Sequence, residues 1–241
     1  MPTTLLDRSA SSLARFSQHE VQALLDAARL FKQPGVAAGR RLLGRHVAVL
    51  SELPAGPSAE AFTEAASALG AQVVRIPVGA AHLDDPRSRR NTARVLGRLY
   101  CAVGCDGLGA GRASLLARWA GVPVFDAVAS DTHPARLLGD LLTMCEHTHK
   151  SMHDIMLWVA GEAHTPLAQA WQSLAELTGL EVSTGGAGRS DFICQAQAAR
   201  GPGAPLGLLA VQDGRAPRSL LAEQTENHRC MLQALLCEAL T

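Results

Sequence analysis

Short apolar runs alternate with helical stretches along most of the chain. The first helical stretch opens with a capping box, because Ser17 is followed three residues later by Glu20, and it extends to about Phe31 before Gly35 and Gly39 interrupt the pattern. After it, buried strands are expected at 46–51, 72–77, 100–105 and 122–128, and helices at 58–69, 88–99, 112–120 and 133–147. This alternation predicts a mostly parallel sheet with helices on both faces.

The pattern pauses near residues 148–154 and then resumes. Further strands are expected at 155–160, 180–183, 191–195 and 206–212, helices at 165–177 and 219–240, a glycine-rich loop at 184–190 and turns at 199–205. We therefore predict an α/β protein with two lobes, each a mostly parallel sheet flanked by helices. The predicted boundaries are 1–150 for the first lobe, 151–218 for an unusually short second lobe and 219–241 for a C-terminal helix.

The composition is that of a folded globular protein. Hydrophobic residues make up 47% of the 241 residues, and 22 basic side chains balance 22 acidic ones, which argues against non-specific nucleic-acid binding. No apolar run reaches the roughly 18–20 residues of a membrane span, and the first ten residues do not have the pattern of a secretory signal. Six cysteines without paired metal spacing indicate buried, reduced thiols. These features predict a cytoplasmic protein that binds neither nucleic acid nor a membrane.

Three segments, in order along nearly the whole chain, carry a resemblance to a known family. They are N-T-A-R-V-L-G-R at 91–98, D-T-H-P-A-R at 131–136 with the helix after it, and A-P-R-S-L at 216–220 with Glu226-Asn227. They resemble the D-T-A-R-V-L-G-R helix, the H-P-x-Q element and the S-P-R-S-L and A-E-N-R runs of the ornithine and aspartate carbamoyltransferases. The ornithine branch is the most similar.

The resemblance implies a fold, a reaction and an assembly. Members of that family are homotrimers or multiples of trimers, and their final helix returns to pack on the first lobe. The first lobe binds carbamoyl phosphate, the second binds the amino-acid acceptor, and an amine attacks the carbamoyl carbon as phosphate leaves. We expect no cofactor and no metal ion.

The family's phosphate loop, S-T-R-T-R, falls on residues 55–59 of this chain. Both arginines are replaced, by Pro57 and Ala59, and only Ser58 keeps a comparable hydroxyl. A third arginine of the family, after strand 100–105, is replaced by Asp106. Because a hydrogen bond to a charged group contributes about 1.5–3 kcal/mol, losing three arginines predicts binding weaker by roughly 5 kcal/mol.

Other family positions have changed as well. The histidine of H-P-x-Q is kept as His133, but Arg136 stands in place of the glutamine, one helical turn away. His228 replaces the arginine of A-E-N-R, and His164 replaces an asparagine of the acceptor lobe. The H-C-L-P motif, expected near residues 209–212, is absent, and the chain between residues 195 and 206 is too short for the family's acceptor segments.

The sequence thus predicts a catalytically weak or inactive paralogue with a structural or regulatory role. His133 is the candidate catalytic residue, although a structural role at the helix start fits it equally well; the candidate ligand-binding residues are Ser58, Arg136, His164 and His228. The expected partners are further copies in a homotrimer, an active carbamoyltransferase or a small anionic metabolite. An alternative is an enzyme of altered specificity, which transfers a carbamoyl or related group to an amine through His133 and Arg136. A third is a carbamoyltransferase completed by residues of a partner chain.

Overall fold

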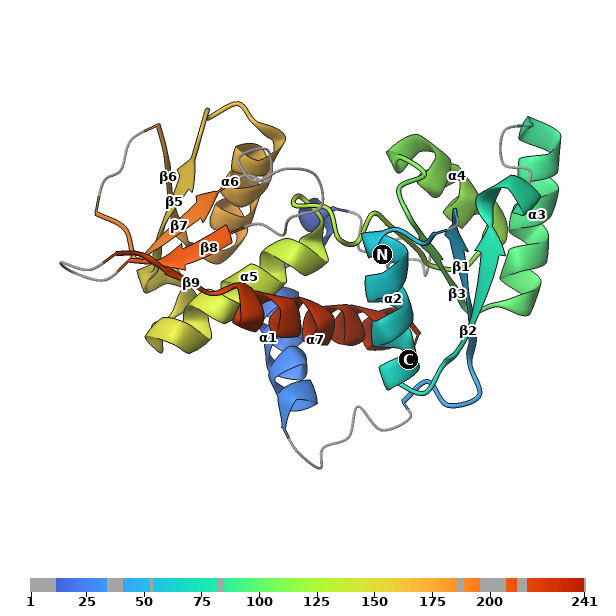
Figure 1. Ribbon diagram of the computed structural model, residues 1–241, viewed down its shortest axis with the longest axis horizontal. Coiled ribbons are helices and arrows are strands. Elements are labelled where there is room, and N and C mark those ends of the chain that lie inside the picture. Colours follow the sequence, from blue (N-terminus) through green and yellow to red (C-terminus); the bar gives the residue numbers. More distant parts are fainter. Residues whose placement is uncertain are drawn as a thin grey trace.

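The computed structural model describes residues 12–33, 41–52, 54–81, 85–185, 189–195, 207–211 and 216–240. It contains two sheets at opposite ends of the molecule, with helices packed between them (Figure 1). This arrangement confirms the predicted α/β class.

Sheet A has four parallel strands in the order β2-β1-β3-β4. The strands are β1 (His46–Ser51), β2 (Gln72–Pro77), β3 (Ala102–Cys105) and β4 (Val124–Asp126). β1 and β3 are adjacent in the sheet although β2 separates them in the sequence. Their carboxyl ends therefore flank the switch point at which open α/β sheets bind ligands.

Helices cover both faces of sheet A, as the alternation of its strands requires. They are α2 (Pro57–Ala68), α3 (Pro86–Leu99) and α4 (Ala110–Ala120). Val47 and Val49 of β1 belong to the core that contains α2, whereas Ala48 and Leu50 belong to the smaller core under α3 and α4. Burial on both faces explains why β1 reads as a continuous apolar run.

Sheet B has five strands in the order β6-β5-β7-β8-β9. The strands are β5 (Met156–Ala160), β6 (Glu181–Thr184), β7 (Phe192–Gln195), β8 (Gly207–Ala210) and β9 (Arg218–Ser219), and helix α6 (Pro166–Thr178) follows β5. β5, β6 and β7 are parallel as expected, whereas β8 and β9 pair antiparallel. Sheet B is therefore mixed.

Three helices connect the two sheets: α1 (Gln18–Lys32), α5 (Pro134–Thr148) and α7 (Leu221–Leu240). α7 packs against α1, α2 and α5, so the last helix returns to the early part of the chain as the resemblance implied (Figure 1). Asn227 of α7 donates a hydrogen bond to the Thr143 hydroxyl of α5 at 3.0 Å. One apolar core joins residues of both sheets through these helices.

Local predictions also have clear outcomes. The capping box of α1 is confirmed, because Glu20 N donates to Ser17 Oγ and Ser17 N donates to Glu20 Oε2. α7 begins at Leu221 instead of at 219, because Ser219 pairs with Leu209 in β9. Short 3₁₀ turns occupy Leu13–Arg15, Val78–Ala81 and Met152–Asp154.

Some expectations fall outside the described residues. They are the glycines at 35 and 39, the turns at 199–205 and the middle of the loop at 184–190. Within the described ranges, no helix is both long and apolar enough to span a bilayer.

Candidate functional site

The amino end of helix α2 holds a carboxylate of the same chain. Asp106 directly follows β3, and α2 begins after β1, the neighbour of β3 in the sheet. Asp106 Oδ2 accepts a hydrogen bond from Gly56 N at 2.6 Å, and Oδ1 accepts from Ser58 N at 3.1 Å and Ala59 N at 3.2 Å. Free N–H groups and the helix dipole make this end an anion site. Here the anion is Asp106.

Gly56 is the N-cap of α2 and has no side chain to cap the helix. A Cβ at this position would overlap the carboxylate of Asp106. The absence of a side chain therefore allows Asp106 to approach the backbone, and Asp106 in turn satisfies the N–H groups that Gly56 cannot cap.

Ser58 is buried and its hydroxyl has a structural partner. Ser58 Oγ accepts a hydrogen bond from Ala129 N at 3.0 Å. This hydrogen bond joins the start of α2 to the segment between β4 and α5. The hydroxyl that the sequence offered as a ligand contact therefore joins two parts of the chain.

His133 is the N-cap of α5 and is 6% exposed. Its Nδ1 accepts a hydrogen bond from Ala135 N at 3.1 Å, so the proton of the neutral ring lies on Nε2. Burial, and to a smaller extent neighbouring His228, lowers the pKa of His133 to about 3. Among the described residues, Nε2 has no hydrogen-bond partner. His133 thus offers one uncharged donor at neutral pH.

His228 projects from α7 toward the same segment. Its Nε2 lies 2.9 Å from the carbonyl oxygen of Val128, and because a carbonyl only accepts, the ring donates. Burial lowers the pKa of His228 to about 4, and the charge of Arg136 acts in the same direction. At neutral pH this ring is therefore uncharged.

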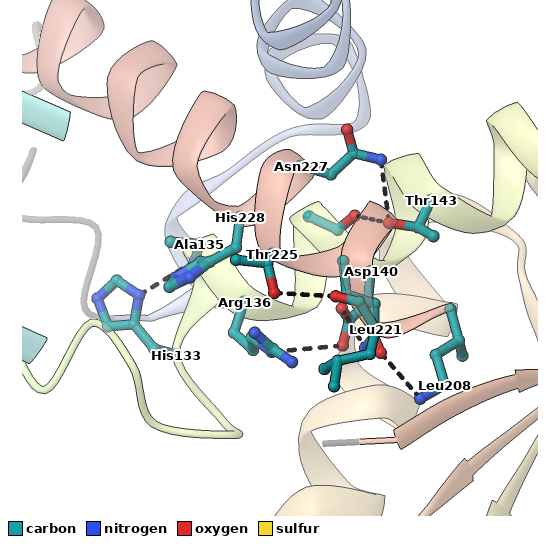
Figure 2. A network of polar contacts seen from close by, with 12 residues as sticks. His133, Ala135, Arg136, Asp140, Thr143, Leu208, Leu221, Thr225, Asn227 and His228 are labelled. Carbon is teal, nitrogen blue, oxygen red and sulfur yellow. Dashed lines mark hydrogen bonds and ion pairs between the residues drawn. The ribbon is translucent and has the colours of Figure 1, made fainter. Parts of the chain in front are cut away.

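Arg136 belongs to a buried polar network that connects α5, α7 and β8 (Figure 2). Its Nε lies 3.8 Å from Asp140 Oδ2, one helical turn along α5. Asp140 Oδ1 accepts a hydrogen bond from Gln224 Nε2 at 2.8 Å, and Gln224 Oε1 accepts from Leu208 N at 3.0 Å. Burial raises the pKa of Asp140 to about 6, although the charge of Arg136 opposes that rise.

The structure brings together four of the five residues that the sequence singled out. Ser58, His133, Arg136 and His228 gather around the segment from β4 to the first turn of α5. His164 is exposed in the turn between β5 and α6, and within the described ranges no hydrogen bond or ion pair joins it to the others. The described residues contain no group of three His, Cys, Asp or Glu side chains that could hold a metal ion.

Sequence reasoning missed Asp126, the last residue of β4. Its carboxylate accepts hydrogen bonds from Gly107 N at 3.0 Å, Leu108 N at 2.8 Å and Gly109 N at 3.0 Å, just before α4. The available signal was its place at the end of a buried strand beside a glycine-rich turn. The carboxyl edge of sheet A therefore carries two carboxylates, Asp106 and Asp126, both bound to backbone N–H groups.

Residues 8–146 match the family model described as aspartate/ornithine carbamoyltransferase, carbamoyl-P binding domain. The catabolic ornithine carbamoyltransferase of Burkholderia mallei is 34% identical over 204 residues, which cover 82% of this chain and 61% of the relative. The chain thus spans about three fifths of the length of this curated relative.

Solved structures show the same fold. Ornithine carbamoyltransferase from Thermus thermophilus superposes with a TM-score of 0.78 at 21% identity, and the match covers 100% of both chains. The Pyrococcus furiosus enzyme gives 0.63 at 22% identity, over 76% of this chain and 58% of that one. The family model covers more than half of the sequence, including the lobe that contains Asp106 and His133, and this match shows that the chain belongs to the aspartate/ornithine carbamoyltransferase family.

Proposed function

We propose that this chain is a family member that transfers carbamoyl groups weakly or not at all and has a structural or regulatory role. The observation that carries the proposal is the Asp106 carboxylate at the amino end of α2, where it accepts hydrogen bonds from Gly56, Ser58 and Ala59. A phosphate could use these N–H groups only after displacing Asp106, and it would then lie beside a like charge.

The chemistry of transfer needs groups that these residues do not supply. A leaving phosphate requires cations, and a polarised carbamoyl oxygen requires preorganised donors. His133 and His228 are neutral at physiological pH. Arg136 is charged but lies beside buried Asp140, and moving it toward a ligand would leave that carboxylate without its countercharge.

Without carbamoyl transfer, the role that we infer for this chain is assembly with other protein chains or with a metabolite. We propose a cytoplasmic homotrimer, as in the family, whose further partner is an active carbamoyltransferase or a small anionic metabolite. The retained fold supports this proposal, since a TM-score of 0.78 over the whole chain is compatible with a preserved surface for assembly. All six cysteines are free thiols, which fits a reducing compartment.

The direct test is a carbamoyl-transfer assay with carbamoyl phosphate and either ornithine or aspartate, run beside the Burkholderia mallei enzyme. We expect turnover at least a thousandfold below that enzyme, because the lost arginine contacts correspond to roughly 5 kcal/mol. Isothermal titration with carbamoyl phosphate should give no measurable heat of binding. Turnover within tenfold of the relative would contradict the proposal.

An enzyme of altered specificity is the second candidate function, and the uncharged donor of His133 is the observation that favours it. The same assay with a panel of other amines examines it. Substitution of Arg136 by Gln should then abolish any turnover that is found. If turnover survives that change, Arg136 has no part in the reaction.

A further inference from the structure

Helices α3 and α4 cover one face of sheet A, and the sequence of neither helix contains an acidic residue. α3 carries five arginines and α4 carries two, whereas the whole chain has 22 basic and 22 acidic side chains. The two helices pack against each other, and α3 lies at the end of the molecule farthest from sheet B (Figure 1). Positive charge is therefore concentrated on one layer of a chain that has no net charge.

Four of the arginines form a stripe on the solvent face of α3. The arginine stripe consists of Arg87, Arg90, Arg94 and Arg98. These residues are three or four positions apart and all are exposed, so their side chains follow one another along the same side of the helix. At 1.5 Å per residue the stripe is about 17 Å long. It presents a line of charge to solvent, with one arginine at nearly every helical turn.

The arginine stripe has no acidic partner within the described part of the chain. None of its four guanidinium groups forms an ion pair with a described residue. Asp85 precedes α3, but it is the N-cap of this helix and its carboxylate accepts a hydrogen bond from Ser88 N at 2.7 Å. The charge of the stripe is therefore available to carboxylates of another molecule.

Two aliphatic side chains lie beside the arginine stripe. Val95 is 52% exposed and Leu99 is 61% exposed, and they are one helical turn apart. Exposed aliphatic groups next to charged ones suit a protein partner, because protein interfaces combine an apolar part with a polar rim. A phosphate backbone would gain little from them. The sequence of α3 also has no aromatic residue on which a base could stack.

We propose that α3 docks an acidic amphipathic helix of a partner protein. Carboxylates spaced by one turn along the partner helix pair with the arginine stripe, because a guanidinium group binds a carboxylate through two parallel hydrogen bonds. Aliphatic side chains on the same helix cover Val95 and Leu99. The inference goes beyond the proposed loss of carbamoyl transfer and does not depend on it, since α2 and α3 lie on opposite faces of sheet A.

The first test uses a synthetic helical peptide of about 18 residues, or five turns, with glutamate at each turn and leucine along the adjacent line. Fluorescence anisotropy measures its binding to the full-length protein. We expect saturable binding that weakens about tenfold between about 10 and 150 mM salt, because the screening length falls from about 30 to about 8 Å. A peptide with glutamine in place of glutamate should bind at least tenfold more weakly. Equal binding of the two peptides would overturn the proposal.

Reversing two charges tests the arginine stripe directly. Arg90→Glu with Arg94→Glu should weaken binding of the acidic peptide at least tenfold, because two attractions become repulsions. The matched control is Arg41→Glu with Arg189→Glu, which changes the net charge equally at exposed arginines outside α3 and α4. The control should bind within about twofold of the original chain. If both double variants lose the same affinity, net charge alone explains binding and the proposal is wrong.

A second pair of variants tests the aliphatic contact. Val95→Ser with Leu99→Ser keeps every arginine and should still weaken binding of the acidic peptide several-fold, because apolar surface is no longer buried. Unchanged affinity would mean that the surface attracts any polyanion. A single-stranded oligothymidylate, or vesicles of phosphatidylcholine with phosphatidylserine, that bound more tightly than the peptide would also overturn the assignment to a protein helix.

Two further measurements keep the result decisive. If Arg90→Glu with Arg94→Glu does not fold, Arg90→Gln with Arg94→Gln takes its place, because glutamine is a good helix former, and it should weaken binding of the acidic peptide about threefold. Analytical ultracentrifugation then compares the mass of each variant with that of the original chain. A smaller assembly in the stripe variant would show that another copy of this chain covers α3, which contradicts the proposal of a different partner.

Discussion

The amino ends of α2 and α5 lie at the same edge of sheet A but are capped in opposite ways. At α2, the charged carboxylate of Asp106 occupies the backbone N–H groups. At α5, the neutral ring of His133 caps the helix with one nitrogen and keeps a donor on the other. The amino end of α2 therefore holds an internal anion, whereas the amino end of α5 holds an uncharged donor.

The largest expected effect on stability concerns the buried ion pair of Arg136 and Asp140 on α5. Asp140→Ala should lower the free energy of unfolding by about 3–5 kcal/mol, because it leaves Arg136 buried without its carboxylate. Urea unfolding measures this loss. The double variant Arg136→Leu with Asp140→Leu should recover most of it. A loss below about 1 kcal/mol in Asp140→Ala, the range of exposed ion pairs, would mean that Asp140 contributes little to holding Arg136 in place.

The second prediction concerns the Asp106 carboxylate at the amino end of α2. Asp106→Ala should lower the free energy of unfolding by about 2 kcal/mol, because three N–H groups lose their acceptor. Inorganic phosphate should then raise the melting temperature of the variant but not that of the original chain, by binding at the vacated helix end. Asp106→Asn, which keeps the shape and loses the charge, is the control and should show an intermediate loss. Equal phosphate responses in all three proteins would show that Asp106 does not block this end.

Acid should act mainly on the two buried histidines. The pKa values of His133 and His228 fall from 6.5 to about 3 and about 4 in the folded chain, so the unfolded chain binds more protons between these limits and stability decreases as the pH drops below 6.5. The pKa of Asp140 rises from 3.8 to about 6, which works in the opposite direction between pH 6 and 4. The effect of the two histidines outweighs that of the one carboxyl group. The free energy of unfolding should therefore fall by about 1.4 kcal/mol per pH unit as the pH drops from 6 to 4.

Urea unfolding as a function of pH, with His133→Asn as the comparison, measures this dependence. The variant lacks one of the two histidines, so its stability should be nearly independent of pH between 6 and 4. A variant that loses stability with acid as steeply as the original chain would show that His133 is not held neutral.

The smallest effect is steric. Gly56→Ala should displace the Asp106 carboxylate, because the new Cβ would overlap it, and should cost about 1 kcal/mol, the typical value of a helix cap. Thermal unfolding measures the change, and phosphate should stabilise this variant as it does Asp106→Ala. The exposed glycine Gly111, whose Cβ would meet nothing within 4 Å, serves as the control through Gly111→Ala.

Much of this comparison could be predicted from the sequence. Ser17 and Glu20 predicted the start of α1, because a capping box involves only neighbouring residues. The family resemblance also placed Asp106 at a position where the motif has a phosphate-binding arginine, and this assignment stays a prediction. The bonds of Asp106 to the α2 backbone were not evident from the sequence, because they require β1 and β3 to be neighbours, which periodicity does not encode. The i, i+4 spacing of Arg136 and Asp140 on one helix is a sequence signal for their pairing.

The antiparallel direction of β8 and β9 was beyond sequence reasoning for a different reason. Short apolar runs have the same pattern in either direction, so only the pairing partners reveal it. The same limit applies to His133. Its position at the start of α5 was expected, but its neighbour His228 belongs to α7, which is separate in sequence.

The return of α7 to the early helices has a consequence for how the chain is made. During synthesis α1, α2 and sheet A emerge long before α7, yet α7 covers α1 and α2 in the finished core. Until α7 is available, a nascent chain exposes the apolar surface that this helix later buries, a condition that favours aggregation. Ribosome-bound chains arrested before α7 should therefore depend on chaperones, and completion of the core should coincide with arrival of the last described helix.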